Sequence, residues 1–160
     1  MTTRRLPWMM AFTLAAAAGR PLVGQSISPD RQAVMAPVRQ LFDAMRKGDG
    51  ATAREAFHPG ALLATAAVKD GQALPQVNDL QRFLSAVGAP RSEAWDERLY
   101  DEQVLVDGPL AVVWAEYSFF RGTTFSHCGV DTFQLVKTGE KWQILALTDT
   151  RRTTGCRTTP

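Results

Sequence analysis

The sequence contains few residues of the kinds that bind metal ions. Among 160 residues there are two histidines, His58 and His127, and two cysteines, Cys128 and Cys156. The histidines lie far apart, and neither has carboxylates at ligand spacing. A zinc site takes three or four nitrogen, sulfur or oxygen ligands. We therefore expect neither a metal ion nor another cofactor.

Several motifs are missing as well. The chain has no glycine-rich phosphate-binding loop and no motif of a nucleophilic serine, which argues against a phosphate-loop nucleotide site and a typical serine hydrolase. It also has no internal repeat, no low-complexity stretch and no sign of a second domain. A chain of this length suits one domain with a sizeable hydrophobic core.

Positive charge is scarce outside the first residues. The net charge is +2, yet Arg4, Arg5 and Arg20 all precede the first acidic residue, Asp30. Removal of residues 1–25 takes away three of the 18 basic residues and none of the 16 acidic ones, which leaves a net charge of about −1. Nucleic-acid binding requires a basic stripe or patch, so we expect no nucleic-acid partner.

The first 25 residues have the pattern of an export signal. Arg4 and Arg5 precede the uncharged run 6–19, and Arg20 ends it. This run suits the core of a signal peptide and is shorter than the ~20 apolar residues that span a bilayer. We predict a cleaved signal peptide over 1–25 and an exported mature chain, periplasmic or extracellular, without a stable membrane span. The alternative is a signal anchor that stays in the membrane.

The first half of the mature chain has a helical period. Apolar residues form one helical stripe at Val34, Val38, Leu41, Phe42 and Met45. Pro37 lies within the stripe, so the helix either kinks there or begins there. We predict a second helix over 51–57, capped by Asp49, then a short strand over 61–68 and a third helix over 76–87.

The second half has the pattern of strands. We predict strands over 95–106, 110–120, 125–136 and 141–150, separated by turn signals that include Asp107-Gly108 and Thr138-Gly139-Glu140. Helices followed by an antiparallel meander indicate an α+β fold with helices on one face of a sheet.

Export changes the interpretation of the two cysteines. In an oxidising compartment, Cys128 and Cys156 are expected to form a disulfide that ties the C-terminal tail to the sheet. Closure of a loop of about 28 residues stabilises the fold by roughly 3–4 kcal/mol in the chain-entropy model. The alternative is two separate thiols, one buried and one on a frayed tail.

The motifs and their order resemble the nuclear transport factor two-like (SnoaL-like) superfamily. The similar segments are Lys47-Gly48-Asp49 before 56–59, Asp107-Gly108 before 110–114, and 125–131 followed by Trp142, Ile144 and 149–152. The last set is similar to an exported bacterial group within the superfamily that is called lumazine-binding-like. The resemblance covers about residues 31–156, nearly the whole mature chain.

This resemblance implies a cone-shaped domain over residues 26–156, followed by a short tail at 157–160. A strongly curved antiparallel sheet wraps around N-terminal helices, and the open end of the cone often holds a small, mostly apolar ligand. Some relatives are isomerases, cyclases, dehydratases or epoxide hydrolases. Others only bind a ligand or dimerise through the outer face of the sheet, so the fold does not decide the function.

His127, Asp131 and Tyr117 are the candidate acid–base residues. Strand alternation places His127 and Asp131 on one face, about 13 Å apart, so they do not form a direct dyad. Imidazole exchanges protons near neutral pH, and the Tyr117 hydroxyl suits a ligand oxyanion. The alternatives are a structural histidine bonded to its surroundings and a tyrosine that fills the core.

Further ligand contacts are predicted at Trp114, Phe133, Asp149 and Arg151. The fork of an arginine suits a carboxylate or phosphate, although 149–152 is also typical of a surface ion-pair network. Tryptophans such as Trp114 also serve packing. Glu116 lies on an apolar strand and needs a partner, for which Arg151 or Arg152 is available.

Three functions remain open from the sequence. The first is an exported protein that binds a small apolar or aromatic molecule. The second is an isomerase, cyclase or dehydratase that uses His127 with Asp131 or Tyr117. The third is a homodimerising module without a ligand. A pocket of a few hundred Å³ favours the first two, and a strongly shifted pKa at its wall favours the enzyme.

Overall fold

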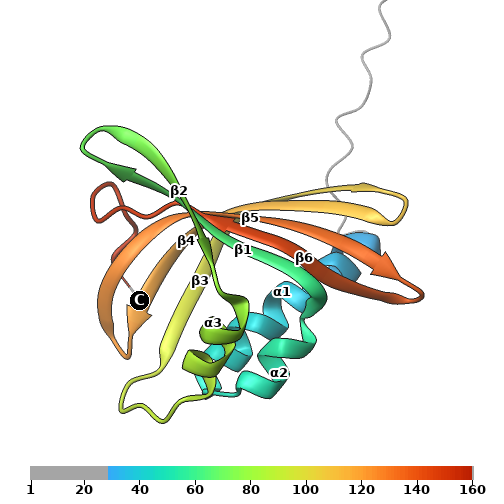
Figure 1. The fold of residues 1–160 in the computed structure, drawn as a ribbon, viewed down its shortest axis with the longest axis horizontal. Coiled ribbons are helices and arrows are strands. Elements are labelled where there is room, and N and C mark those ends of the chain that lie inside the picture. Colours follow the sequence, from blue (N-terminus) through green and yellow to red (C-terminus); the bar gives the residue numbers. More distant parts are fainter. Residues whose placement is uncertain (1–28, 160) are drawn as a thin grey trace, which may run out of the picture.

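The computed structural model describes residues 29–159, and the predicted signal peptide over 1–25 lies outside the described residues. In this part of the chain the elements are α1 (Pro29–Lys47), α2 (Gly50–Glu55), β1 (Phe57–Lys69), β2 (Gln72–Asn78), α3 (Leu80–Gly88), β3 (Trp95–Asp107), β4 (Leu110–Arg121), β5 (Thr124–Thr138) and β6 (Lys141–Asp149) (Figure 1). The predicted α+β class is confirmed.

The strands form one sheet in the order β2-β1-β6-β5-β4-β3. Strands β3 to β6 pair with their chain neighbours as an antiparallel meander, as predicted. Strand β1 pairs antiparallel with β2 but lies parallel to β6. A parallel pair is possible here because a long crossover, and not a hairpin, joins β1 to β6. The sheet is therefore mostly antiparallel, with one exception that the sequence did not predict.

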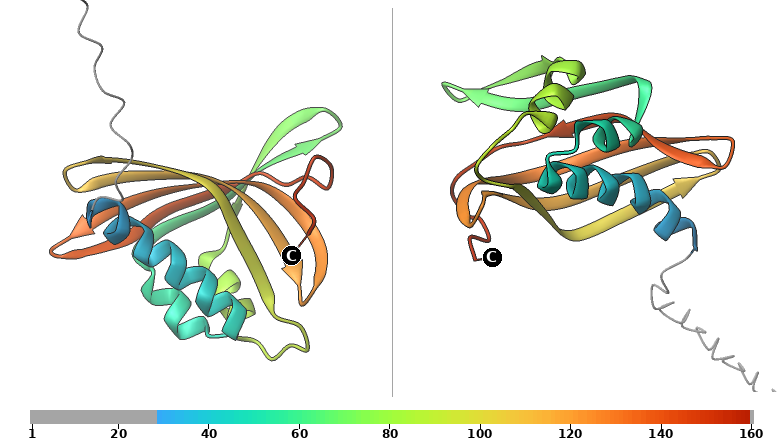
Figure 2. Two further views of the ribbon diagram at one scale, coloured as in Figure 1. Left: turned by 180° about the vertical axis from the view of Figure 1, so that it is seen from behind. Right: turned by 90° about the horizontal axis from the view of Figure 1, so that it is seen from below.

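The sheet curves around the helices, which lie on its concave side (Figures 1 and 2). The predicted helical stripe faces this side, and Val34, Val38 and Leu41 are fully buried there. Phe42 packs edge-on against Phe133 of β5, with ring centroids 6.1 Å apart. The predicted cone, an unclosed curved sheet wrapped around N-terminal helices, is confirmed.

Local sequence explains where the helices begin. Asp49 caps α2 by accepting hydrogen bonds from the backbone N–H and the hydroxyl of Thr52, at 2.9 and 2.6 Å. Asp79 caps α3 in the same way through the backbone N–H groups of Gln81 and Arg82. Helix α1 begins at Pro29 and continues through Pro37, so the alternative of a start at Pro37 is wrong.

Two predicted helix boundaries are also wrong. Helix α2 ends at Glu55, because Phe57 already belongs to β1. The third helix begins at Leu80, and residues 76–78 complete β2, a strand that was not predicted. Every residue of β2 is exposed. It therefore lacks the alternation of apolar and polar residues by which a half-buried strand is recognised.

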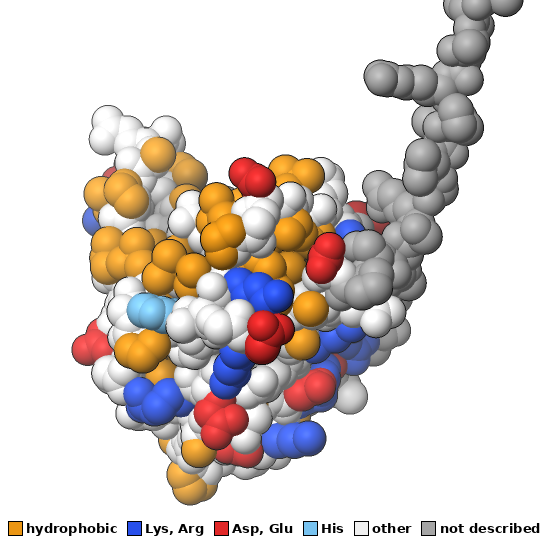
Figure 3. Space-filling model, turned by 90° about the vertical axis from the view of Figure 1, so that its right-hand side faces the viewer, with side chains coloured by type: hydrophobic (Ala, Val, Ile, Leu, Met, Phe, Trp, Pro, Cys, Tyr) orange, Lys and Arg blue, Asp and Glu red, His pale blue; other side chains and the backbone are white. Residues whose placement is uncertain are grey.

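Large hydrophobic side chains lie on the surface of the sheet. Val68 and Val77 of the β1–β2 hairpin are each 72% exposed, and Leu105 of β3 is 71% exposed. Figure 3 shows hydrophobic side chains gathered over the upper part of one face of the molecule, with most charged side chains below them. Apolar side chains that gather on one face of a molecule often mark an interaction site.

Candidate functional site

A cavity of about 790 Å³ opens between the helices, the concave side of the sheet and the β1–β2 hairpin. Its apolar wall comes from α1, β1, α3 and β6 and consists of Leu41, Phe42, Met45, Leu63, Phe83 and Leu147. The exposed residues Asn78, Asp79 and Arg82 also line it, where β2 is followed by α3. The volume is within the range of small-molecule sites, about 300–1,000 Å³.

Three carboxyl groups reach the cavity from three strands. Glu97 lies on β3, Asp131 on β5 and Asp149 at the end of β6. Asp131 and Asp149 are paired directly across their strands, and the Glu97 carboxyl is close enough to that of Asp131 for a hydrogen bond. Asp131 is only 2% exposed, and its Oδ2 atom meets no hydrogen-bond donor among residues 29–159. A hydrogen bond between the two carboxyl groups therefore requires that one of them carries a proton.

The surroundings favour the protonated form of this pair. Burial raises the pKa of Glu97 to about 7, and the Asp149 carboxylate acts in the same direction. Burial also raises the pKa of Asp131 well above its ordinary value, and the charge of Glu97 adds to this shift. Because adjacent carboxylates repel each other, the two shifts favour a proton on the Glu97–Asp131 pair near neutral pH. Such a group suits proton exchange with a ligand or its recognition by hydrogen bonds.

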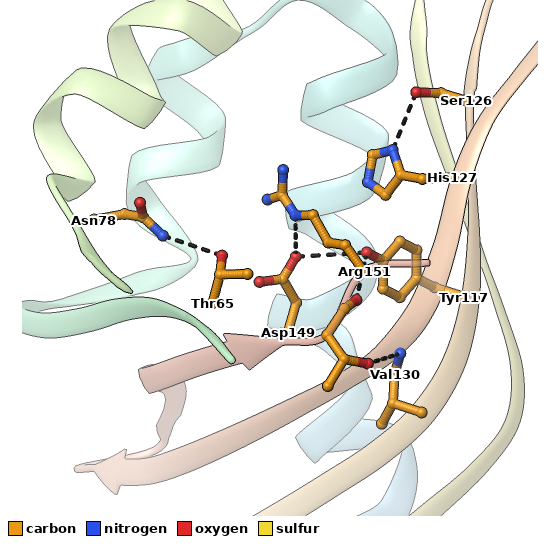
Figure 4. A network of polar contacts seen from close by, with 9 residues as sticks. Thr65, Asn78, Tyr117, Ser126, His127, Val130, Asp149 and Arg151 are labelled. Atoms are coloured by element: carbon orange, nitrogen blue, oxygen red, sulfur yellow. Dashed lines mark hydrogen bonds and ion pairs between the residues drawn. The ribbon is translucent and has the colours of Figure 1, made fainter. Parts of the chain in front are cut away.

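Arg151 and Tyr117 surround the third carboxyl group (Figure 4). Arg151 donates from Nε to Asp149 Oδ2 at 2.7 Å, and the two residues form an ion pair. The Tyr117 hydroxyl lies 3.5 Å from the same oxygen and donates to the backbone carbonyl of Thr150 at 2.9 Å. Burial, followed by the charge of Asp149, raises the pKa of Tyr117, so the hydroxyl remains a donor. The terminal nitrogens of Arg151 point away from Asp149.

The residues that follow β6, 150–157, lie against β5, and we call them the C-terminal strap. The N–H of Thr150 donates to the carbonyl of Val130 at 3.0 Å, and Arg152 exchanges two backbone hydrogen bonds with Cys128. The predicted disulfide between Cys128 and Cys156 is confirmed. These bonds hold the strap, and with it Arg151, at the edge of the cavity.

Gly129 of β5 provides the space that the strap needs. A Cβ atom at this position would lie 1.8 Å from the carbonyl oxygen of Thr150 and 2.7 Å from Cε1 of Tyr117. Only a residue without a side chain allows the strap to approach β5 so closely. The same close approach brings the Thr150 carbonyl to the Tyr117 hydroxyl.

We call Glu97, Asp131 and Asp149 the acidic cluster. His127 lies beside this cluster but is not among the described residues that line the cavity. Its ring packs against Tyr117 and Phe119, with centroids 5.7 and 5.0 Å away. The Ser126 hydroxyl is hydrogen-bonded to Nδ1 at 3.0 Å (Figure 4). Burial, and then the positive charge of Arg151, lower the pKa of His127, so the ring is neutral at pH 7. An acid–base role for His127 stays a prediction.

The structure separates the other predicted ligand contacts. Asp131, Asp149 and Arg151 line the cavity together. Trp114 lies on the outer face of β4, because it alternates with the buried residues Val113 and Ala115. Phe133 is fully buried in the core, where it packs against α1 and not along the cavity.

Glu97 is the site residue that the sequence interpretation missed. The sequence contains one indication of its role. Glu97 lies on the same face of the predicted strand as Trp95 and Leu99, so it places a carboxyl group on an otherwise apolar face. The suggested partner of Glu116 is corrected. Its carboxylate lies 3.7 Å from Arg157 of the strap, and not beside Arg151 or Arg152. Between residues 29 and 159, no three His, Cys, Asp or Glu side chains are grouped to hold a metal ion.

A curved, unclosed sheet around helices and a cavity defines the nuclear transport factor two-like class, and solved structures share this fold. A protein of this class from Shewanella baltica is 14% identical over 78% of this chain and 95% of that chain, with a TM-score of 0.58. A "putative dehydratase" of the class from Streptomyces avermitilis is 17% identical over 78% and 97%, with a TM-score of 0.60. A protein of unknown function from Mycobacterium tuberculosis is 16% identical over 79% and 78%, with a TM-score of 0.61.

The sequence itself identifies the family within this class. Residues 29–148 match the model of the family described as "Putative lumazine-binding", and the chain belongs to that family. No curated protein matches the chain in sequence. Sequence identities as low as these to solved structures establish a shared fold and nothing more, so the function has to be argued from the site.

Proposed function

We propose that this domain binds a small, largely apolar or aromatic molecule in the cavity between α1, α3 and the sheet. The proposal rests on the cavity itself, which combines a volume of about 790 Å³ with an apolar wall and a few carboxyl groups. Sites for small molecules have this composition, in which apolar walls supply contact area and a few polar groups fix the orientation. The family description supports the same class of ligand, because it names lumazine, an aromatic heterocycle.

Native mass spectrometry of the protein purified from its own host tests this proposal. We expect a small-molecule adduct that is lost on denaturation. Ala86 of α3 lines the cavity, so Ala86→Phe should fill the space and abolish the adduct. The control is Ser85→Phe, because Ser85 is exposed on the same helix. Wild-type protein without an adduct, or an adduct that Ala86→Phe retains, would contradict the proposal.

An acid–base enzyme is the second candidate, and the Glu97–Asp131 pair favours it. A carboxyl group with a pKa of about 7 beside a cavity is suited to take up and return a proton at neutral pH. On a substrate identified from the adduct, Asp131→Asn should lower kcat by about 10²–10⁴-fold. Full turnover by His127→Ala would remove His127 from the acid–base set, and full turnover by Asp131→Asn would remove Asp131 from it. The absence of turnover by the wild type would reject the enzyme.

Export of the mature chain is also proposed. The disulfide supports it, because such bonds persist in oxidising compartments. Within residues 29–159, no helix has both the length and the hydropathy to cross a bilayer. The test is the N-terminal residue of the protein recovered from cell fractions. A mature chain that begins near residue 26 in the periplasm or the medium supports export, and an uncleaved cytoplasmic chain opposes it.

A homodimer through the outer face of the sheet is the remaining proposal. Leu105 pairs with Val112, a residue of the outer face, and is 71% exposed. Leu110 lies on the same face and is 51% exposed. Burial of such side chains against a second copy removes apolar surface from water.

A further inference from the structure

Among the described residues, the acidic cluster of Glu97, Asp131 and Asp149 leaves one buried acceptor atom without a hydrogen-bond donor. Asp131 is 2% exposed and lines the cavity, and its Oδ2 atom meets no donor among the described residues. Buried polar atoms in native proteins almost always have a hydrogen-bond partner. Glu97 and Asp131 satisfy each other only while one of the two carboxyl groups keeps a proton. A ligand that brings its own donor is therefore the natural partner of this atom.

The charges around the cavity favour a positive donor over a neutral one. Among the described residues that line it, Asp79, Glu97, Asp131 and Asp149 face only two basic side chains, Arg82 and Arg151. The nearer of these, Arg151, already donates to Asp149 at 2.7 Å. Tyr117 faces the cluster from β4 as a neutral donor, and its hydroxyl bonds to the Thr150 carbonyl. The negative charge of Glu97 and Asp131 is therefore balanced only in part.

The rest of the cavity suits an organic body and not a bare ion. Phe42 and Phe83 line it together with aliphatic side chains, and aromatic faces attract organic cations. Residues 29–159 contain no group of three or more His, Cys, Asp or Glu side chains that could hold a metal ion. On the basis of the proposed function, we propose that the cavity binds a small organic cation. Its apolar or aromatic body fills the cavity, and its protonated amine pairs with Asp131 and Glu97.

This pairing couples binding to the release of a proton. In the free protein the close approach of the two carboxyl groups favours a proton between them, and burial raises the pKa of Glu97 to about 7. A cation between the two carboxylates takes the place of this proton. Its affinity should therefore rise as the pH increases from about 6 to 8, while a neutral ligand of the same shape should show little pH dependence. Asp149, Arg151 and Tyr117 surround the pair. The raised pKa values of Arg151 and Tyr117 keep the guanidinium charged and the hydroxyl neutral over this range.

Isothermal titration calorimetry with three probes of one shape tests the inference. The probes are 2-naphthylmethylamine, 2-naphthylmethanol and 2-naphthoate, which are positive, neutral and negative at pH 7. We expect the amine to bind at least tenfold more tightly than the alcohol at pH 8, and the naphthoate to bind most weakly. Titrations near pH 6.5 in two buffers of different ionisation enthalpy should show release of up to one proton per amine bound.

Matched variants assign the preference to the carboxyl pair. Glu97→Gln and Asp131→Asn should each weaken binding of the amine at least tenfold. Each should change the affinity for the alcohol by less than about threefold. The exposed Glu140 lies in the β5–β6 turn, and Glu140→Gln should bind all three probes as the wild type does. Circular dichroism checks folding, and the partly exposed Glu97 provides the test if Asp131→Asn does not fold.

The outcomes separate this inference from the proposed function. If the amine and the alcohol bind equally, the cavity binds small molecules but does not select a cation, and the inference is wrong. An amine preference that survives both Glu97→Gln and Asp131→Asn also overturns it. If the folded protein binds none of the three probes, the inference and the proposed function both fail.

Discussion

At the scale of single residues, Gly129 is, among the described glycines, the position where an added Cβ atom would meet its nearest neighbour at the shortest distance. A Cβ atom there would overlap the Thr150 carbonyl, which lies on backbone and cannot rotate away. We expect Gly129→Ala to lower the free energy of unfolding by about 2–4 kcal/mol, because β5 and the strap must separate. Urea denaturation monitored by tryptophan fluorescence measures this change.

Gly60 of β1 provides the matched control. The nearest atom to a Cβ at this position is Nδ1 of His58 at 3.6 Å, an ordinary contact. Gly60→Ala should therefore change the free energy of unfolding by less than about 1 kcal/mol. Equal denaturation midpoints for the two variants would show that the strap can move away from β5 without a loss of stability, and would contradict this prediction.

Residue alternation located part of the site and missed the rest. The pattern of β5 placed Asp131 on the inner face correctly, because the face of a strand residue follows from its position alone. Glu97 was missed because its importance depends on the register between β3, β4 and β5. The pairing puts Glu97 opposite Phe119 and Asp131 opposite Ala115, and the curvature of the sheet adds to it in bringing both carboxyl groups to one cavity. Register is a long-range property, and the spacing of residues within one strand does not reveal it.

At the scale of elements, the C-terminal strap depends on the disulfide between Cys128 and Cys156. Cys156→Ser should lower the free energy of unfolding by roughly 3–4 kcal/mol, because it reopens a loop of about 28 residues. Amide hydrogen exchange should also become faster at Arg152, which is bonded to Cys128. The comparison is made under oxidising conditions, and dithiothreitol should bring the wild type to the level of the variant. Unchanged exchange in the variant would show that the backbone bonds hold the strap without the disulfide.

The elements themselves were predictable where the sequence has a clear period. The ends of β3, β4, β5 and β6 agree with the predicted strands to within two residues, since each strand has turn residues at its ends and a buried face. Strand β2 has neither a buried face nor apolar alternation, so its pairing with β1 determines its structure. The parallel contact between β1 and β6 was not predictable either, because strand direction follows from the path of the whole chain.

At the scale of the whole molecule, the exposed outer face makes a specific prediction about assembly. Light scattering coupled to size-exclusion chromatography should give the mass of a dimer for the mature protein, and Leu105→Glu should shift it to a monomer. A charge placed in an apolar interface loses its hydration without gaining a partner. Val68→Glu is the control, because Val68 is equally exposed on the β1–β2 hairpin. A wild-type monomer would exclude this dimer.

The overall architecture was predictable from the order of helices and strands, whereas the cavity was not. An amphipathic stripe and a strand-rich second half require helices packed on one side of a sheet. The volume of the cavity depends on the distance between the β1–β2 hairpin and α3. The sequence of neither element indicates this distance. The carboxyl groups at the cavity come from three strands, so their meeting is a property of the complete fold.

The placement of Asp149 at the end of β6 and of Arg151 in the strap has a consequence for the order in which the protein matures. During synthesis, the helices and most of the apolar wall leave the ribosome well before these two residues, which complete the charged side of the cavity. Covalent closure at Cys156 then requires an oxidant, which the cytosol of most cells does not supply. A nascent or reduced chain thus has the hydrophobic hollow before its charged rim is secured, so ligand loading is expected to follow folding and oxidation.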